Sequence, residues 1–292
     1  MSSKITIPIT VISDTICPWC YIGKRRLERA IASYRLTNPD INFSITWKPF
    51  YLDPMATVED KLGRYNKKFG AGRVAQMIPY MIDVAKKEGI EMKYGGLVGP
   101  TQASHRLIKL AEKEGNQDAV VNAFFDEYFT QNSNISDPNV LAGAAAKAGL
   151  MGGDKEKIKD FLETEDGQLE VEQEVFQAQR RGVSGVPHFI VDNRYELGGA
   201  QEPPAFLRVF NDVVKSKAAS GAAAPADGQR SVTLLLRIYR YQTIVPEQST
   251  NTSRGGPEIH LLNKTNDTTT IQKMPKHQSS PLHNFLHAKP NS

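Results

Sequence analysis

The two cysteines of this chain, Cys17 and Cys20, are separated by two residues, a spacing typical of redox or metal chemistry. The β-branched run at 5–12 before them predicts a strand, and residues 23–31 behind them predict a helix. The thiols therefore stand where a strand gives way to a helix N-terminus. Unpaired backbone N–H groups and the positive end of the helix dipole favour negative charge there, and the thiolate is the reactive form of cysteine.

The number of available ligands decides between redox and metal chemistry. A zinc site needs four ligands, and the sequence contains neither a second cysteine pair nor a paired-histidine motif. We therefore predict no metal and a redox-active dithiol. In such a dithiol, Cys17 would attack a disulfide as a thiolate, and Cys20 would resolve the mixed disulfide.

The elements that must position these thiols begin with a β-α-β unit. Residues 42–50 alternate apolar and polar side chains, as a half-buried strand does. A long helical region follows at 55–182, with apolar residues at helical spacing. About five helices are expected there: near 74–85, from 102 to 114, from an N-cap at Asp118 to 129, from 136 to 148, and from Asp154 to Arg180.

Strands return near the end of this region. Residues 187–191 and 194–197 form a predicted hairpin around Asp192-Asn193, and a closing helix starts at Pro203. From Lys217 the composition becomes linker-like and then polar, which predicts a largely disordered tail. One run in the tail, 232–239, is a strand candidate that would need a partner.

Charge and composition exclude several classes of protein. The chain has 292 residues, of which 40% are apolar, enough for an ordinary core. Residues 1–216 hold 27 basic and 28 acidic side chains, whereas residues 217–292 hold 9 and 4, so the folded part carries no charge footprint for nucleic acid. No apolar run is long enough for a membrane helix. No targeting segment is visible, so we expect a cytoplasmic protein.

Several separated motifs, in this order along the chain, carry a family resemblance. They are Ser13-Asp14 before the dithiol, Ser104-His105-Arg106-Leu107, Asn134-Ile135-Ser136-Asp137, Gly185-Val186-Pro187, and Gly198-Gly199-Ala200-Gln201. Over about residues 5–215 the chain resembles the FrnE-like branch of the DsbA-like thioredoxin-fold oxidoreductases. The resemblance implies an α/β thioredoxin fold with an inserted all-helical domain. The expected segments are the N-terminal part of the thioredoxin fold at 1–54, the helical insertion at 55–182, the C-terminal part at 183–216, and the tail at 217–292.

The resemblance also implies a second half of the site at Val186-Pro187. In the family this proline is cis and faces the dithiol, which leaves the preceding backbone free to pair with an extended substrate. The residues alone would favour a trans proline that opens a strand. Pro18 and Trp19 are expected to tune exposure and potential, although Trp19 fits a packing role equally well.

Three side chains near the dithiol could titrate. Asp14 would accept protons if it were buried, but an N-cap or a solvated turn carboxylate is slightly favoured. His188 would stabilise a thiolate if it stood beside the dithiol, with a half-exposed strand residue as the equal alternative. His105 is expected to be a core histidine with a satisfied hydrogen bond. The backbone amides at 199–201 could hold a glutathione carboxylate, although a plain turn is favoured.

These observations predict a thiol–disulfide oxidoreductase that acts on a disulfide-bearing protein or a small thiol. We expect no bound cofactor, glutathione as a candidate co-substrate, and a monomer or homodimer. A reducing cytosol would favour a reductase. One alternative is a glutathione-dependent transferase or isomerase of the kappa-class type, which is similar in architecture but lacks the dithiol. Another is a non-catalytic binding module that uses the helical insertion as its surface.

Overall fold

A computed structural model describes residues 5–222 of the chain, with the side chains of 5–219. It confirms the α/β thioredoxin fold with a helical insertion. The predicted strand at 232–239 and the polar tail beyond residue 222 lie outside the described residues.

A four-stranded sheet lies at the centre, with the strand order β2-β1-β5-β6. The strands are β1 (Ile5–Ser13), β2 (Ile41–Pro49), β5 (His188–Val191) and β6 (Tyr195–Gly198). β1 pairs in parallel with β2 and antiparallel with β5. The predicted β-α-β unit and hairpin are therefore confirmed, and both turn residues of the hairpin, Asp192 and Asn193, have positive φ angles as a tight turn requires.

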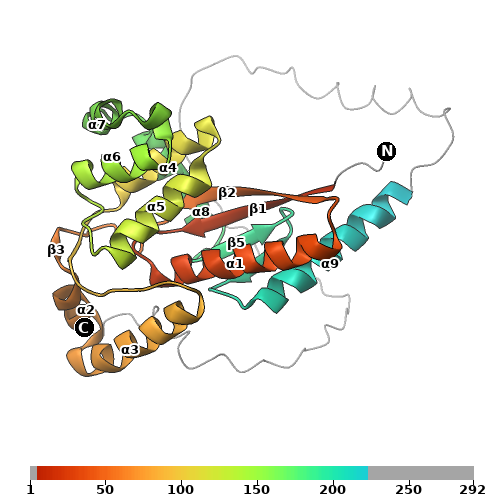
Figure 1. Ribbon diagram of the computed structural model, residues 1–292, viewed down its shortest axis with the longest axis horizontal. Helices are drawn as coiled ribbons and strands as arrows, with labels where there is room; N and C mark the ends of the chain where they lie inside the picture. Colours follow the sequence, from red (N-terminus) through yellow and green to blue (C-terminus); the bar gives the residue numbers. More distant parts are fainter. Residues whose placement is uncertain (1–4, 223–292) are drawn as a thin grey trace, which may run out of the picture.

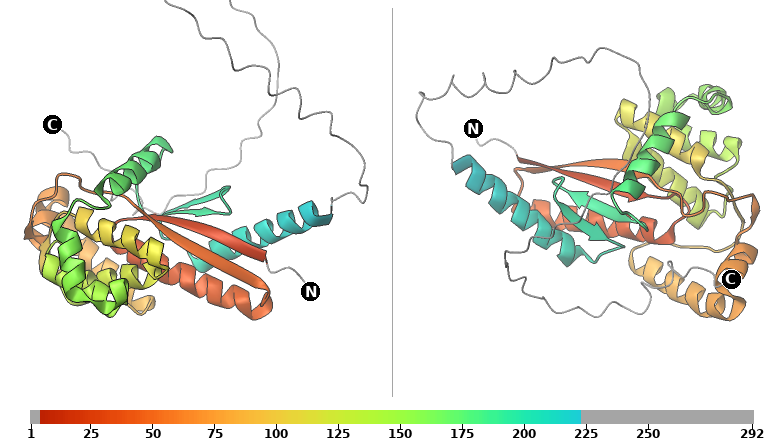
Figure 2. Two further views of the ribbon diagram at one scale, coloured as in Figure 1. Left: turned by 90° about the horizontal axis from the view of Figure 1, so that it is seen from above. Right: turned by 180° about the vertical axis from the view of Figure 1, so that it is seen from behind.

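Helices cover both faces of the sheet. α1 (Pro18–Thr37) and α9 (Pro203–Ala222) pack side by side on one face, while α8 (Gln168–Arg180) lies over the other (Figure 2). Aromatic side chains join the first pair to the sheet, with ring centroids 5.0 Å apart for Phe189 and Phe206. This packing fixes the start of α1, and with it the dithiol, against the start of β5.

The helical insertion gathers at the end of the sheet where β1 ends (Figure 1). Its helices are α2 (Lys61–Phe69), α3 (Ala71–Lys87), α4 (Gln102–Glu114), α5 (Gln117–Thr130), α6 (Pro138–Lys147), the 3-10 turn η1 (Leu150–Gly153), α7 (Lys155–Glu163) and α8. A short two-stranded ribbon, β3 (Glu59–Asp60) with β4 (Leu97–Val98), ties the start of α2 to the segment before α4. The insertion thus closes over the dithiol end of the molecule.

The helix count within residues 55–182 was underestimated, because seven α-helices replace the expected five. α2 was not predicted, since its sequence is mostly polar and contains a glycine. The single helix expected from Asp154 to Arg180 is two helices, α7 and α8. The chain leaves helical geometry at Thr164, and Gly167 then takes a left-handed φ of 78°.

One predicted boundary was also wrong. Asp118 is not the cap of α5, because Asn116 occupies that position, and the Asp118 carboxylate instead accepts from the indole N–H of Trp47 and pairs with Lys24. α9 continues to Ala222, past the expected boundary at residue 216, which fits the high helix propensity of alanine. Among the described helices, none has the length and apolar content that crossing a membrane requires.

Candidate active site

Cys17 and Cys20 occupy the first turn of α1, as the sequence predicted. Cys17 is the N-cap residue, Pro18 takes the first helical position, and the backbone N–H of Cys20 donates to the carbonyl of Cys17 at 3.0 Å. Proline suits this position because the first-turn N–H groups have no helical partner. Both cysteines are free thiols and both are 0% exposed. The dithiol is therefore enclosed.

The two thiols differ in their surroundings. Burial raises the pKa of Cys20 well above its ordinary value, and hydrogen bonding and charge from Cys17 raise it further. The Ser13 hydroxyl and the Asp14 backbone act in the opposite direction and lower that pKa. Cys17 sits at the N-terminus of α1, where the dipole favours negative charge. The geometry thus suits a nucleophile at Cys17 and a protonated partner at Cys20.

The segment before β5 faces the dithiol from across the sheet end. The Cys17 thiol donates to the carbonyl of Val186 with an Sγ to O distance of 3.5 Å, and the Val186–Pro187 peptide bond is cis. α1 approaches this segment so closely that a Cβ on Gly23 would lie 3.0 Å from Pro187 Cγ. Glycine at position 23 is thus what allows α1 to carry the dithiol against Pro187.

Asp14 is buried, contrary to the favoured expectation of a cap or solvated carboxylate. It is 0% exposed at the end of β1, and its Oδ2 accepts from the backbone N–H of Leu52 at 2.8 Å. Its other oxygen, Oδ1, has no hydrogen bond within the described part of the chain. The family resemblance had singled out Ser13-Asp14, and the structure places this carboxylate behind the dithiol, closed to solvent.

His105 is buried as expected, but it is not satisfied as a core histidine usually is. Its Nε2 lies 3.5 Å from Asp14 Oδ1, and neither atom has a hydrogen-bond partner among the described residues. The ring packs against Tyr51, with centroids 5.7 Å apart. α4 therefore brings a histidine of the insertion to a carboxylate of the sheet.

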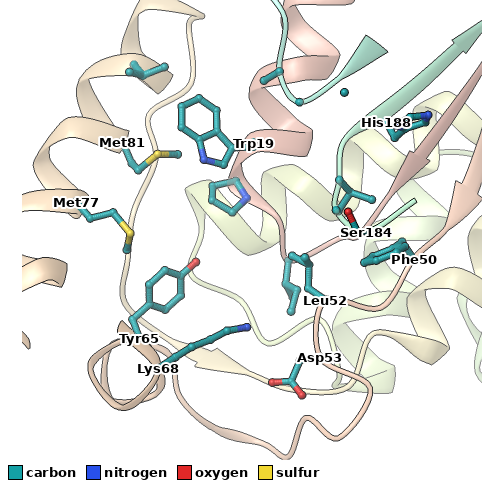
Figure 3. Close-up of a pocket in the computed structure, with 18 of the residues that line it drawn as sticks. Trp19, Phe50, Leu52, Asp53, Tyr65, Lys68, Met77, Met81, Ser184 and His188 are labelled. Carbon is teal, nitrogen blue, oxygen red and sulfur yellow. The ribbon is translucent and has the colours of Figure 1, made fainter. Parts of the chain in front are cut away.

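His188 begins β5 and is partly buried, with its Nε2 3.0 Å from Glu196 Oε2 on the neighbouring strand. No contact joins its ring to the thiols. It lines the cavity described next, at the side of the sheet (Figure 3). Of the two alternatives, the half-exposed strand residue describes it better.

A cavity of about 750 Å³ opens beside the dithiol, between the thioredoxin part and the α2–α3 pair. Figure 3 shows Trp19, Tyr65, Met77 and Met81 on one wall. The facing wall is formed by Phe50, Leu52, Ser184 and His188. The period of residues 74–85 pointed to Met77 and Met81 as inward-facing, whereas no sequence signal pointed to Tyr65.

Tyr65 lines the cavity from α2. Burial raises the pKa of Tyr65, and negative charge at Cys17 contributes in the same direction, as it does for Tyr94. The rings of Tyr65 and Tyr94 meet edge to face at 5.6 Å. These tyrosines therefore lie near enough to Cys17 to sense its charge.

The cavity has a mixed polar rim. Arg26 is paired with Glu88 and Glu202, and Arg64 is paired with Asp53 and Glu59. Lys68 extends into the cavity (Figure 3), and burial followed by the charge of Arg64 lowers its pKa. The rim can therefore receive a polar or anionic part of a bound molecule.

The other sequence-predicted groups have ordinary roles. The amides of Gly199 and Gln201 are engaged, by the carbonyls of Pro187 and Gly199 respectively, so this junction is a plain turn. Trp19 is partly buried and both packs on the core and lines the cavity. Within the residues that the structure describes, no group of three or more metal-ligating side chains comes together.

Comparisons with known proteins show which family the chain resembles. Residues 8–211 match the model of the DSBA-like thioredoxin domain. An uncharacterised Bacillus subtilis protein, YwbO, is 27% identical over 222 residues, which cover 73% of this chain and 100% of that protein. A probable DsbA oxidoreductase from Streptomyces coelicolor has a similar solved structure, with a TM-score of 0.65, 27% identity, and coverage of 76% of this chain and 94% of that one.

A 2-hydroxychromene-2-carboxylate isomerase is similar in fold alone. Its TM-score is 0.55 at 15% identity, with coverage of 73% of this chain and 98% of that chain. The likeness shows that the same architecture occurs in an isomerase, so the reaction has to be argued from the residues of the site.

Proposed function

We propose that this chain is a thiol–disulfide oxidoreductase, since it belongs to the DSBA-like thioredoxin domain family and carries the Cys17–Cys20 pair at the start of α1. In this proposal Cys17 is the nucleophile and Cys20 the resolving thiol. Val186 and Pro187 face them and hold the substrate.

The observation that carries the proposal is the arrangement of the two thiols around the helix N-terminus. Cys17 is the N-cap residue and touches the Val186 carbonyl, while Cys20 lies one turn deeper with a raised pKa. An attacking thiolate in contact with the substrate side and a protonated second thiol behind it are what stepwise disulfide exchange needs.

The exchange balances without a further cofactor. The Cys17 thiolate attacks one sulfur of the substrate disulfide and displaces the other as a thiolate, which leaves a mixed disulfide. Cys20 then loses its proton and attacks Cys17 Sγ, forming the Cys17–Cys20 disulfide and releasing the second substrate thiol. Two electrons pass from the dithiol to the substrate. Two molecules of an external thiol such as glutathione then restore the dithiol by successive exchange and leave as their own disulfide.

Small disulfides are the substrates that the enclosure of the dithiol favours. Cys17 is 0% exposed, and the cavity beside it has the size of a small-molecule site. A disulfide on the surface of a folded protein would have to displace the cavity wall first. We therefore propose a low-molecular-weight disulfide as substrate, with glutathione as candidate co-substrate.

The motifs of the sequence support a finer assignment within the family. The Ser104-His105-Arg106-Leu107 and Gly198-Gly199-Ala200-Gln201 segments support assignment to the FrnE-like branch. A cytoplasmic reductase is the corresponding direction, because a reducing cytosol keeps both thiols reduced at rest.

Disulfide reduction by the full chain tests the proposal. The assay compares a small aliphatic disulfide, bis(2-hydroxyethyl) disulfide, with insulin as a protein disulfide, using dithiothreitol as the reductant. Wild type is expected to accelerate reduction of the small disulfide about tenfold more than that of insulin, and Cys17→Ser should bring both to the uncatalysed rate. Unchanged turnover in Cys17→Ser would end the proposal, and equal acceleration of both substrates would end the substrate assignment.

A further inference from the structure

We propose that the cavity beside the dithiol selects disulfides of thiols that carry both a carboxylate and an apolar arm, with the Lys68 ammonium binding the carboxylate. The inference deepens the proposed function and rests on it, because it names the substrate class of the same site. It also separates the substrate from glutathione, a polar peptide, which keeps the role of the thiol that restores the dithiol.

The first observation is the charge balance of the cavity lining. Among the described residues that line the cavity, the lysine and arginine residues are Arg26, Arg64 and Lys68, and the acidic residues are Asp53 and Glu202. Arg26 pairs with Glu202, and Arg64 pairs with Asp53. The other oxygen of Asp53 accepts from the backbone N–H of Met55 at 3.2 Å. Both carboxylates of the lining are therefore already bound.

The second observation is a cation that lacks such a partner. Lys68 forms no ion pair with a carboxylate in the part of the chain that the structure describes, unlike the two arginines of the lining. Its Nζ lies over the Phe69 ring, 5.7 Å from the centroid, and the side chain extends into the cavity (Figure 3). A carboxylate on a bound molecule would supply the missing counter-charge through a charge-assisted hydrogen bond.

Two tyrosine hydroxyls add donors beside this ammonium. Tyr65 lies three residues before Lys68 on α2, and Figure 3 shows its hydroxyl pointing into the cavity. Tyr94 packs edge to face on the Tyr65 ring, and its buried hydroxyl has no hydrogen-bond partner among the described residues. A buried donor without an acceptor is costly, and a carboxylate accepts only. This end of the cavity therefore favours an anionic group.

The wall next to these donors has the opposite chemistry. Trp19 from α1 and Met77 and Met81 from α3 face the cavity (Figure 3). An indole stacks on aromatic rings, and thioether sulfurs make favourable contacts with ring edges. The amides of a peptide would lose water at this wall without gaining hydrogen bonds. An aromatic or alkyl arm therefore fits this wall better than glutathione does.

The same cavity reaches the reactive sulfur. Ile16 and Pro18, the neighbours of Cys17, line it, and so does Val186, whose carbonyl accepts from the Cys17 thiol at 3.5 Å. A volume of about 750 Å³ is that of a small-molecule site. A substrate with its disulfide at Val186 can extend an apolar arm past Trp19 and place its carboxylate at Lys68.

Three disulfides with the same two-carbon arm test the recognition of the carboxylate on the full chain. They are 3,3'-dithiodipropionate, which is anionic, bis(2-hydroxyethyl) disulfide, which is neutral, and cystamine, which is cationic. Reduction is measured with dithiothreitol and corrected for the uncatalysed rate. We expect Lys68→Met to lower kcat/KM for the anionic disulfide about tenfold relative to the neutral one, and to raise it for cystamine relative to the neutral one.

Lys67→Met is the matched control. Lys67 is the neighbouring lysine on α2, but it pairs with Glu59 at 2.7 Å and does not line the cavity. This variant should keep the wild-type ratios among the three disulfides. Equal changes in the two variants would mean that the general surface charge of α2 sets the preference. Unchanged ratios in Lys68→Met would overturn the assignment of the carboxylate site.

The disulfide of 4-(mercaptomethyl)benzoate tests the apolar arm. It carries the carboxylate on an aromatic ring, and its sulfur is bonded to a CH₂ group as in 3,3'-dithiodipropionate. We expect a KM about tenfold below that of 3,3'-dithiodipropionate, and Met81→Gln should remove most of this difference. If the KM for glutathione disulfide were as low as that for the aromatic disulfide, the separation from glutathione would be wrong.

Binding without chemistry separates this inference from the proposed function. The thioether 4-[(methylthio)methyl]benzoate has the same arm and no disulfide, and calorimetry measures its affinity for the full chain. Its Kd should rise about tenfold in Lys68→Met and stay the same in Lys67→Met. If the thioether binds in this way but no disulfide is reduced, only the proposed function fails. If disulfides are reduced but the thioether binds wild type and Lys68→Met equally, only the substrate site fails.

Discussion

The dithiol lies between two regions of different chemistry. On its buried side are Ser13, Asp14, Thr15, Ser104 and His105, all polar and all closed to solvent. On its cavity side are Trp19, Tyr65, Met77 and Met81, which are aromatic or contain a thioether and face open space (Figure 3). The buried side is suited to handling protons, and the cavity side to binding an apolar part of a substrate. The two tasks are thus divided between the two sides of one pair of sulfurs.

The largest expected effect is on stability, and it comes from Lys61, which holds the start of α2 on the cavity side. Lys61, at the start of α2, is 1% exposed, donates to the Tyr128 carbonyl at 3.1 Å and lies over the Tyr128 ring. Burial lowers its pKa to about 8. The folded state therefore holds fewer protons than the unfolded state between about pH 8 and about pH 10, and stability rises with pH through this window.

Lys61→Met should remove this rise. Relative to the variant, wild type is expected to gain on the order of 3 kcal/mol of unfolding free energy between about pH 8 and about pH 10. Urea unfolding at several pH values measures the difference between the two proteins. Lys24→Met is the control, because Lys24 is equally buried but paired with Glu28 and Asp118. Parallel curves for wild type and Lys61→Met would show that Lys61 does not carry the burial cost.

The second largest expected effect is also on stability, and it comes from the close packing of α1 against Pro187. A Cβ at Gly23 would meet Pro187 Cγ at 3.0 Å and the Phe189 ring at 3.1 Å, so Gly23→Val overfills this contact. We expect a loss of about 2 kcal/mol in unfolding free energy, together with reduced disulfide reduction, since the dithiol moves away from Pro187.

Gly72→Ala is the matched control for that substitution. Nothing lies within 4 Å of a Cβ at position 72 in α3, and alanine should stabilise that helix by about 0.5 kcal/mol. The urea midpoints and the disulfide-reduction rates of wild type, Gly23→Val and Gly72→Ala test this prediction. A stable and fully active Gly23→Val would mean that the start of α1 is not held against Pro187.

Widening the cavity should have the smallest effect on stability, but it should measurably increase the access of reagents to Cys17. In a Cys20→Ser background, Tyr65→Ala is expected to raise the alkylation rate of Cys17 by a bulky maleimide about tenfold, and that by iodoacetamide less, because loss of the Tyr65 ring widens the cavity beside the dithiol. Leu62→Ala, on the exposed side of α2, serves as the control. Equal rates in all three proteins would show that α2 does not limit access.

The part of the site that lies on the sheet could be predicted from the sequence. The β-branched run before Cys17 and the turn at Asp192-Asn193 are local signals, so β1, α1 and the β5–β6 hairpin were predictable. α2 was missed because its buried residue is Lys61 and its Tyr65 is only partly buried, a pattern that no apolar period reveals. The meeting of Asp14 with His105 was likewise hidden, since it depends on how α4 packs against β1.

The same contrast explains why the cavity could not be foreseen. Met77 and Met81 were expected to face inward from their helical spacing, but the spacing does not say whether they meet a core or a cavity. Only the placement of α2 and α3 beside Trp19 leaves the space open.

The most direct test of the central assignment is the identity of the cysteine that carries the mixed disulfide. Cys20→Ser and Cys17→Ser proteins are each incubated with Ellman's reagent, digested without reductant and mapped by mass spectrometry. The account predicts a stable adduct on Cys17 in Cys20→Ser, and a far slower adduct on Cys20 in Cys17→Ser. Faster modification of Cys20 than of Cys17 would contradict it, because the nucleophile would then be the inner thiol.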